Sequence, residues 1–428
     1  MQMYKHSRCS WTVIAVAIVF IVVLFICHYS DENIFCPELK GQKSILSQSD
    51  YKEIPWNLNR LFEAPQFSWL DSANSVCSLL YEGIEYKNMT TKIFAYYSTP
   101  GLVSGDFTLD RNLPAVVLVH WGWGSADCDW VKLWASRGYA AIAMDLDGNG
   151  PDGKRIQNAG PPAKEYMTEV WNNHAIAKII LAHSLIRSFP EVDENKTGIT
   201  GVSVGGHLTC AVAGIDTRFK AAVPVYGCGY LHEIDEWRNS DLYTGLSDEH
   251  KAIWDWVYDP SNHIGHSSCP ILFVAGTNDL YYPIDKLMKT YMVVPKERRY
   301  LSIIPGLPHN CLQGITMPEI GIFMDSVLSG CAPLPSFSSI VVKNHVIMAQ
   351  VSSRLNLTSA YICFTTDKST YVKKTWSNSI ARVLGNDVVV PRPPEDTVAW
   401  YLLVIDSRRA TASSRIFTGD DLKKKKLE

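Results

Sequence analysis

The hydrophobic positions of this chain form short runs, and the character of the runs changes along the sequence. Between residues 114 and 330, short and continuously apolar runs alternate with longer amphipathic stretches. A continuous apolar run is typical of a strand buried on both faces, and an amphipathic stretch is typical of a helix. The alternation therefore predicts an α/β domain in which helices cover both faces of a mostly parallel sheet.

The predicted strands are short runs in which Val, Ile and Ala predominate, and the predicted helices are longer and more mixed. The interval 228–268 is too long for a plain crossover and is rich in Trp and Tyr, so we expect it to form an inserted cap. The expected strands are 93–98, 115–120, 140–144, 197–202, 221–226, 270–275 and 300–304, and the expected helices are 129–137, 165–188, 207–215, 284–292 and 315–328.

The pattern changes near residue 333, where Pro333 and Pro335 indicate a linker. Short β-rich runs separated by turn residues follow it, with little sign of helix. This part of the chain, residues 333–418, is predicted to be a small β-sandwich. Residues 419–428 contain the run Lys423–Lys426, which we interpret as a charged and solvated tail.

The N-terminal pattern is different, because residues 11–27 contain no charged side chain. This length is just sufficient to span a bilayer, and the preceding Lys5 and Arg8 favour a cytoplasmic N-terminus. We therefore expect residues 1–30 to be the cytoplasmic stub and signal-anchor helix of a single-pass type II membrane protein. The alternative is a secreted protein whose signal peptide is cleaved. Residues 31–100 are predicted to be a stem and an N-terminal lead-in.

Both interpretations place the body of the chain in a lumenal or extracellular compartment. Asn88, Asn195 and Asn356 each begin an N-glycosylation sequon. Nine of the eleven cysteines lie outside the N-terminal segment, and an oxidising compartment permits disulfides among them, although their spacing does not specify the pairs. No Cys or His cluster has zinc spacing, so no metal is expected. The net charge of −3 and the lack of a basic face exclude nucleic acid as an expected partner.

The sequence ITGVSVGGHLTC, residues 199–210, joins a predicted strand to a predicted helix through a glycine-rich turn. A G-x-S-x-G turn of this kind exposes a serine, here Ser203, as a nucleophile, although a purely structural turn is the alternative. Asp279 and His309 favour the first interpretation, because each follows a later strand in the order Ser, Asp, His. Capping of the next helix is the alternative role for Asp279. The sequence thus predicts a catalytic triad of Ser203, Asp279 and His309.

Acyl transfer also requires backbone N–H groups that stabilise the oxyanion. The residue after the nucleophile, Val204, supplies one of them, and the loop after the strand at 115–120 normally supplies the other. Trp121 is the candidate in that loop, with core packing as the alternative role of its side chain. Aromatic faces suit sugar rings or acyl groups, so the candidates for the substrate pocket are Trp123, Trp237 and Tyr281.

Four stretches, which cover most of residues 114–330, carry a resemblance to a known group of enzymes. They are PAVVLVHWGWGSADCDWVKLWASRGYAAIAMDLDGNG, HSLIRSFPEVDENKTGITGVSVGGHLTCAVAGIDTRFKAAVPVYGCGYL, FVAGTNDLYYPID and PHN. They are similar to α/β-hydrolases of the dienelactone hydrolase, acetyl xylan esterase and prolyl oligopeptidase type, and most similar to proteins labelled acetyl xylan esterase. The doubled Gly205–Gly206 is typical of this group. The resemblance implies Ser203 as nucleophile, Asp279 as acid and His309 as base.

These features together predict a doubly wound α/β-hydrolase catalytic domain over residues 101–332. The predicted activity is that of a serine carboxylesterase or deacetylase that acts on a small-molecule or acylated carbohydrate ester and needs no cofactor. Two alternatives stay open, namely a serine peptidase related to prolyl oligopeptidases and a non-catalytic binding or adhesion protein on a hydrolase scaffold. The sequence leaves open the acyl and alcohol groups of the substrate and the oligomeric state.

Overall fold

The computed structural model describes residues 54–162, 165 and 167–427. The predicted stub and signal-anchor helix, residues 1–30, and most of the predicted stem lie outside these described residues. Within them, no helix is both long enough and apolar enough to cross a membrane.

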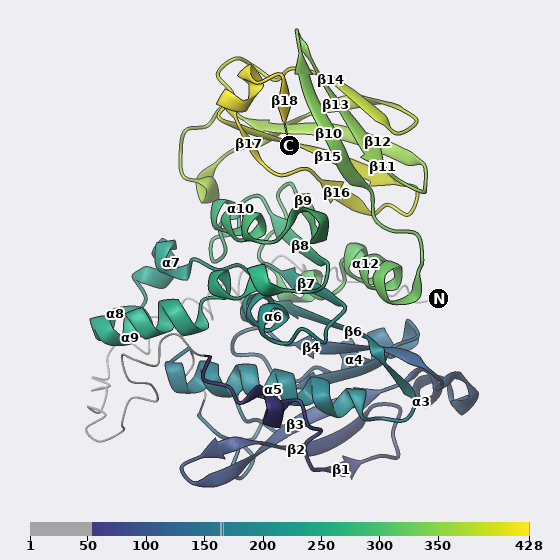
Figure 1. The fold of residues 1–428 in the computed structure, drawn as a ribbon, viewed down its shortest axis with the longest axis vertical. Helices are drawn as coiled ribbons and strands as arrows, with labels where there is room; N and C mark the ends of the chain where they lie inside the picture. The colour runs from purple at the N-terminus through teal and green to yellow at the C-terminus, as the bar shows by residue number, and fades with distance from the viewer. Residues whose placement is uncertain (1–53, 163–164, 166, 428) are drawn as a thin grey trace, which may run out of the picture. The chain divides into compact units, whose positions relative to one another are not determined.

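The first of two sheets has nine strands in the order β1-β2-β3-β5-β4-β6-β7-β8-β9 (Figure 1). Pairing is antiparallel from β1 to β5 and parallel from β5 to β9. The carboxyl ends of β4 and of β6 to β9 therefore share one edge, where an open α/β sheet holds its functional groups. The strands are β1 (Phe67–Asp71), β2 (Cys77–Tyr86), β3 (Met89–Ser98), β4 (Leu113–Val119), β5 (Ala140–Met144), β6 (Val192–Val202), β7 (Ala221–Val225), β8 (Ile271–Gly276) and β9 (Arg299–Ile304).

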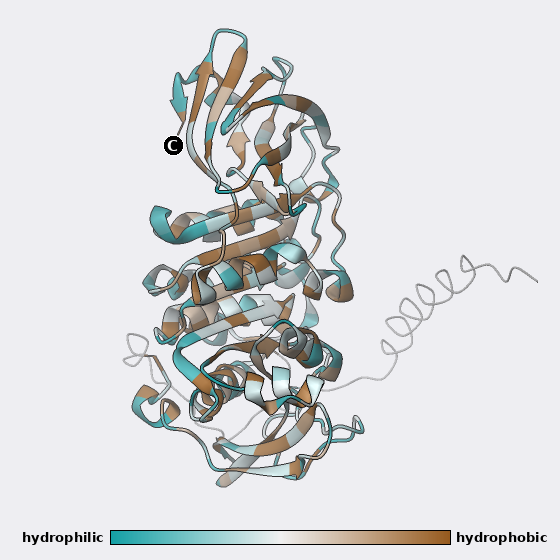
Figure 2. Ribbon diagram, turned by 90° about the vertical axis from the view of Figure 1, so that its right-hand side faces the viewer, coloured by the Kyte–Doolittle hydropathy of each residue, from teal (hydrophilic) through white to brown (hydrophobic). Residues whose placement is uncertain are grey.

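Helices cover both faces of this sheet, so its central strands are buried on both sides (Figure 2). This explains why those strands are continuously apolar in sequence. The long helix α5 begins at Glu169, four residues later than expected, because the Thr168 side chain caps it by accepting from the backbone N–H of Trp171. The helices are α2 (Leu58–Leu61), α3 (Pro100–Ser104), α4 (Cys128–Ser136), α5 (Glu169–Arg187), α6 (Val204–Ile215), α10 (Ile284–Val293), α11 (Cys311–Ile315) and α12 (Pro318–Ser329).

The sheet begins earlier in the chain than residue 101, where we expected the catalytic domain to start. Strands β1 to β3 come from the predicted lead-in and extend the same sheet through the pairing of β3 with β5. A two-residue turn joins β2 to β3, and its residues Lys87 and Asn88 both have positive φ, as a tight hairpin of this type requires. Burial alternates along β2 from Leu79 to Ile84, so this strand has a period-two pattern rather than a continuous apolar run.

The predicted insertion at 228–268 is a series of short helices, α7 (Asp235–Arg238), α8 (Asp241–Thr244) and α9 (Asp248–Ile253), with single turns after them. Trp254 anchors it, because the ring is fully buried and its Nε1–H donates to the carbonyl of Met167 at 3.0 Å. The segment is therefore packed onto the α/β domain rather than held away from it.

The C-terminal region forms a second, antiparallel sheet that folds into two layers, as expected for a β-sandwich (Figure 1). Strand β13 belongs to both layers, because residues 377–381 pair with β12 and residues 382–384 pair with β14. Side chains of both layers, including Ile347, Val390, Trp400 and Leu402, form its core. The strands are β10 (Ser336–Lys343), β11 (Val346–Ser352), β12 (Leu357–Thr365), β13 (Ser377–Leu384), β14 (Asp387–Pro391), β15 (Ala399–Asp406), β16 (Thr411–Ser413), β17 (Phe417–Thr418) and β18 (Lys426–Leu427).

The last residues are part of this domain, and the expectation of a solvated tail over 419–428 is wrong. A capping box of Thr418 and Asp421 begins a short helical turn, and β18 then pairs with β10. Leu427 is 3% exposed and lies in the core of the β domain. The lysines at 425 and 426 stay exposed, because charged side chains can flank a strand whose apolar residue points inward.

The disulfides that the sequence led us to expect are not formed among the described cysteines. All eight of these cysteines carry free thiols, and five of them are buried. A buried free cysteine behaves as a small apolar side chain, which accounts for these positions without a crosslink.

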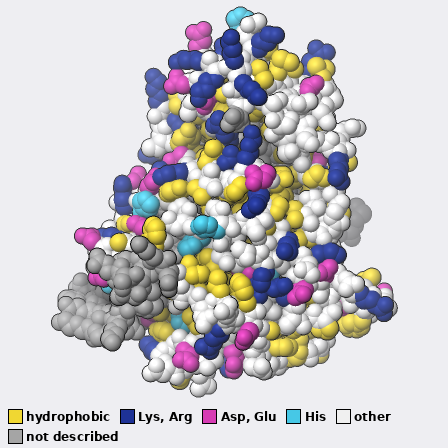
Figure 3. Space-filling view, in the orientation of Figure 1, with side chains coloured by type: hydrophobic (Ala, Val, Ile, Leu, Met, Phe, Trp, Pro, Cys, Tyr) yellow, Lys and Arg dark blue, Asp and Glu magenta, His cyan; other side chains and the backbone are white. Residues whose placement is uncertain are grey.

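On the face of the molecule shown in Figure 3, acidic, basic and apolar side chains are intermingled.

Shortening the buried side chain of β18 is expected to destabilise the protein. Leu427→Ala removes core contacts and leaves a cavity, which should lower the free energy of unfolding by about 2–5 kcal/mol. Denaturant titration measures the change, with Lys425→Ala as a matched control because Lys425 is exposed. Equal stability of the two variants would show that the terminal strand contributes nothing to the core.

Candidate active site

The turn between β6 and α6 places Ser203 at the carboxyl edge of the parallel sheet. Ser203 has φ 60° and ψ −119°, a conformation that a non-glycine residue adopts only under strain. The backbone N–H of Ser203 donates to the carbonyl of Val225 at the end of β7. Such strain is concentrated at functional sites, where it holds a side chain in an orientation that an ordinary turn would not give.

Three glycines make this turn possible, and each of them lies against different backbone atoms. A Cβ on Gly201 would lie 2.2 Å from the carbonyl oxygen of Gly205, across the turn itself. A Cβ on Gly205 would lie 2.1 Å from the oxygen of Val119 in β4, and one on Gly206 would lie 2.4 Å from that of Val225 in β7. The doubled glycine therefore lets the start of α6 approach the strands on both sides of β6.

The structure brings Ser203, Asp279 and His309 together in one hydrogen-bonded line. His309 Nδ1 lies 2.7 Å from Oδ2 of Asp279, and His309 Nε2 lies 3.0 Å from Oγ of Ser203. A carboxylate accepts, so Nδ1 carries the proton and Nε2 is free to accept from the serine hydroxyl. This is the arrangement in which an imidazole can take the proton of a serine nucleophile.

Asp279 is buried, at 1% exposed, and its two oxygens have separate partners. Oδ1 accepts from the backbone N–H groups of Tyr281 and Tyr282, both at 2.9 Å, which leaves Oδ2 to His309. Helix α10 begins only at Ile284, after Pro283, so Asp279 does not cap it. The alternative role that the sequence left open for Asp279 is thereby excluded.

Three tyrosine rings surround the imidazole of His309. The ring centroids of Tyr226 and Tyr281 lie 5.1 and 5.0 Å from it, and Tyr282 stacks against it at 6.1 Å. Burial and the nearby Asp279 raise the pKa of Tyr226, so its hydroxyl stays neutral. Burial and Asp279 also raise the pKa of Cys311 to about 11, so this thiol is protonated and does not compete as a nucleophile.

The loop after β4 is held by its own histidine. His120 Nε2 accepts from the backbone N–H of Leu146 at 2.9 Å, and the Nδ1–H donates to the carbonyl of Trp121 at 2.6 Å. The carbonyl of Trp121 also accepts from the N–H of Gly124.

Val204 is the first residue of α6, so its N–H has no partner within the helix.

The candidates for the substrate pocket do not all lie at this site. Tyr281 does, because its ring contacts His309 and is 56% exposed. Trp123 lies in the loop that carries Trp121 and is 78% exposed. Trp237 instead packs within the inserted segment, 5.1 Å from the ring of Trp254.

Sequence reasoning missed two of the tyrosines, Tyr226 and Tyr282, and two exposed leucines beside the triad residues. Leu280 follows Asp279 directly, and Leu312 lies three residues after His309; they are 42% and 65% exposed. The available signal was their position, since each lies at the end of a predicted strand or within three residues of a predicted triad residue.

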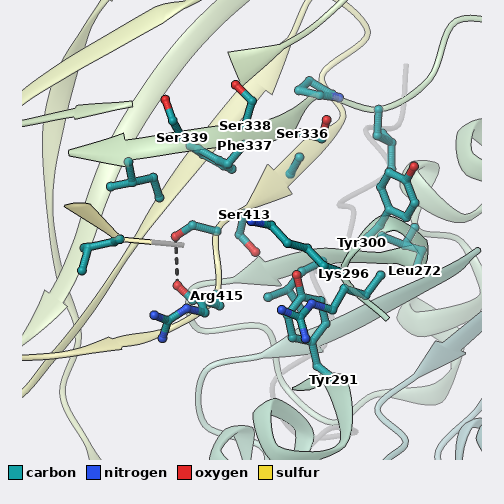
Figure 4. Close-up of a pocket in the computed structure, with 18 of the residues that line it drawn as sticks. Leu272, Tyr291, Lys296, Tyr300, Ser336, Phe337, Ser338, Ser339, Ser413 and Arg415 are labelled. Atoms are coloured by element: carbon teal, nitrogen blue, oxygen red, sulfur yellow. Dashed lines mark hydrogen bonds between the residues drawn. The ribbon is translucent and has the colours of Figure 1, made fainter. Parts of the chain in front are cut away.

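A cavity of about 250 Å³ lies elsewhere, between β9 and the β domain (Figure 4). Its lining includes Tyr291, Arg299, Ser336, Ser413 and Arg415. Arg299 begins β9, whereas His309 follows the end of that strand. The cavity therefore lies by the opposite edge of the sheet from the triad and is not its substrate pocket. Among the described residues, no cluster of His, Cys, Asp and Glu could hold a metal ion.

Comparison with known proteins finds similarity over part of the chain. Part of the chain is 24% identical over 218 residues to the uncharacterized peptidase YuxL of Bacillus subtilis (strain 168), and the match covers 47% of this chain and 31% of that protein. The chain thus spans about a third of the length of this curated relative.

Among solved structures, the chain is similar to acetyl xylan esterase 1 from Thermoanaerobacterium sp. JW/SL YS485, with 17% identity and a TM-score of 0.48 over 64% of this chain and 94% of that chain. It is also similar to the acetyl xylan esterase from Paenibacillus sp. R4, with 20% identity and a TM-score of 0.46 over 62% of this chain and 95% of that chain. Residues 107–304 match the dienelactone hydrolase family. The chain therefore contains a dienelactone hydrolase family domain, and its fold is that of an α/β-hydrolase.

Proposed function

We propose that this protein is a serine carboxylesterase or deacetylase in which Ser203 is the nucleophile, His309 the general base and Asp279 the acid. The observation that carries the proposal is the continuous line of hydrogen bonds, 3.0 Å and 2.7 Å long, from the strained serine to a buried carboxylate. Each of the two bonds joins groups with complementary roles, since the hydroxyl and the Nδ1–H donate and Nε2 and the carboxylate accept.

The reaction follows from these roles. His309 takes the proton of Ser203 as Oγ attacks the ester carbonyl, and the N–H groups of Val204 and Trp121 hold the oxyanion of the tetrahedral intermediate. His309 then gives its proton to the leaving alcohol, and an acyl-enzyme forms. Water, deprotonated by His309, releases the acid and restores the serine. Asp279 maintains the tautomer and stabilises the imidazolium in both steps.

The surroundings of the site favour an ester with an apolar or ring-shaped component. Large apolar surfaces are exposed near the proposed catalytic groups, by Trp123, Leu280 and Tyr281 in loops and by Leu312 in α11. Aromatic faces of this kind pack against sugar rings as well as acyl chains. Acylated carbohydrates, as acted on by the acetyl xylan esterases to which the chain is similar, are therefore one substrate class to test.

A serine peptidase is the second candidate, because the relative YuxL is described as a peptidase. Peptidases of the prolyl oligopeptidase type usually carry a large N-terminal propeller. Here residues 67–98 instead form three strands of the catalytic sheet, and the described residues contain no such domain. A non-catalytic binding protein is the third candidate, but it requires no aligned triad, whereas all three residues are present and hydrogen-bonded.

Removal of the nucleophile is expected to abolish activity without loss of the fold. Ser203→Ala should lower kcat on a short-chain aryl ester by at least about 10⁴-fold, because no other group can form the acyl-enzyme. A fluorophosphonate probe should label the wild-type protein and not the variant. Ser188→Ala is a matched control, because Ser188 lies at the far end of α5.

The same assay separates the candidates when acetylated sugars, acyl esters of several chain lengths and a dipeptidyl amide are compared. Faster cleavage of the amide than of every ester would favour the peptidase. Unchanged turnover in Ser203→Ala, or a wild-type protein that neither turns over substrate nor reacts with the probe, would contradict the proposed mechanism.

We also propose that the catalytic domain is lumenal or extracellular, either anchored as a type II membrane protein or secreted. The three sequon asparagines, Asn88, Asn195 and Asn356, are all exposed, as glycosylation requires. The full chain produced in eukaryotic cells should lose mass on treatment with peptide N-glycosidase, and the triple Asn→Gln variant should not. A wild-type chain with no glycan in this experiment would contradict the proposal.

A further inference from the structure

The β domain contacts the catalytic domain next to the proposed acid. Asn278 directly precedes Asp279, and its side-chain Nδ2 donates to two carbonyls of the β domain. The acceptors are Val372, at 3.1 Å, and Lys374, at 2.7 Å. Both hydrogens of the amide group are thereby used on one short segment of a different domain.

The oxygen of the same amide is connected by hydrogen bonds to the loop that carries the proposed base. Oδ1 of Asn278 accepts from Oγ1–H of Thr277 at 2.7 Å, and Thr277 Oγ1 accepts from the backbone N–H of Gly306 at 3.1 Å. Gly306 lies in the turn after β9, three residues before His309. One chain of hydrogen bonds therefore connects the base loop, the acid loop and the β domain.

The segment that supplies the two carbonyls is itself held firmly. Lys374 is 5% exposed, and its Nζ donates to the carbonyls of Asp367 and Ser369 at 2.6 and 2.7 Å. The carboxylate of Asp367 accepts from the backbone N–H groups of Ser369 and Thr375. The carbonyls are thus presented by a closed and internally bonded loop, residues 367–375, rather than by a free end.

We propose that Asn278 is a positioning residue, and that through it the β domain holds the acid and base loops in their reactive geometry. The proposal rests on the triad function proposed above. A shift of about 1 Å in a catalytic group can lower the rate about 100-fold. Hydrogen bonds that hold the acid and base loops against a second domain therefore help to maintain the rate. Domains within a chain tend to move relative to one another. The hydrogen bonds of Asn278, next to Asp279, would transmit such a movement to the site.

The first test is Asn278→Ala in the full chain, assayed on the aryl ester. Loss of the amide frees both loops, so kcat should fall about 10- to 100-fold with little change in KM. A displaced Asp279 stabilises the imidazolium less, so the acid side of the pH profile of kcat/KM should move to lower pH. Asn278→Asp should also lower kcat, because it keeps the size of the side chain but replaces the donor with a group that repels both carbonyls.

A matched control removes a hydrogen-bonding group from the contact between the same two domains at another place. Thr411 of the β domain donates to Glu319 of α12 and lies 2.6 Å from Oγ of Ser302 in β9, and no hydrogen bond of the described residues joins these groups to Asp279 or His309. Thr411→Val should lower the Tm and leave kcat and the pH profile as in the wild type.

The outcomes separate the two proposals. Kinetics of Asn278→Ala and Asn278→Asp that match those of Thr411→Val, with wild-type kcat and pH profile, would overturn the positioning role while Ser203→Ala is still inactive. An active Ser203→Ala variant would overturn the triad function itself. The proposal is supported if kcat falls in both Asn278 variants and the acid limb moves to lower pH in Asn278→Ala, whereas Thr411→Val shows neither change.

Discussion

The site depends on how closely the backbone at Ser203 approaches its neighbours. No Cβ fits at Gly201, Gly205 or Gly206, where it would lie within 2.4 Å of a backbone oxygen. Because of these approaches the start of α6 lies directly against the ends of β4 and β7. The loop with the proposed oxyanion donor follows the first of these strands, and Tyr226 follows the second. Close approach of the backbones thus brings these segments together at the site.

The polar groups of the triad are then oriented because each has one available partner. Asp279 Oδ1 is taken by two backbone N–H groups, so only Oδ2 is left for His309. The side chain of His309, next to the tyrosine rings, is only 14% exposed, and in such surroundings hydrogen bonds and charges act more strongly than they do in solvent. The carboxylate is buried, whereas the imidazole and the hydroxyl are partly exposed.

The sequence pattern predicted the parts of this arrangement that follow from local order. Continuous apolar runs identified the central strands, and residues that follow three of them, Ser203, Asp279 and His309, were found to lie together. Part of β3 was predicted, over 93–98, but β1 and β2 were not, because β2 shows alternation rather than a continuous apolar run and β1 is mostly exposed. The burial of Leu427 was not predicted, because the lysines before it indicated an exposed segment and no local pattern shows that this segment pairs with β10.

What the sequence determined by itself is the order of strands and helices and the chemical groups at the strand ends, because periodicity and turn residues are local properties. Only the tertiary structure decided which groups meet. Tyr226 and Tyr282 enclose His309, Trp237 packs within the insertion, and Asn278 joins the loops of Asp279 and His309 to residues that follow it by about a hundred positions. Such contacts join residues distant in sequence, and they depend on the packing of two domains that no local pattern describes.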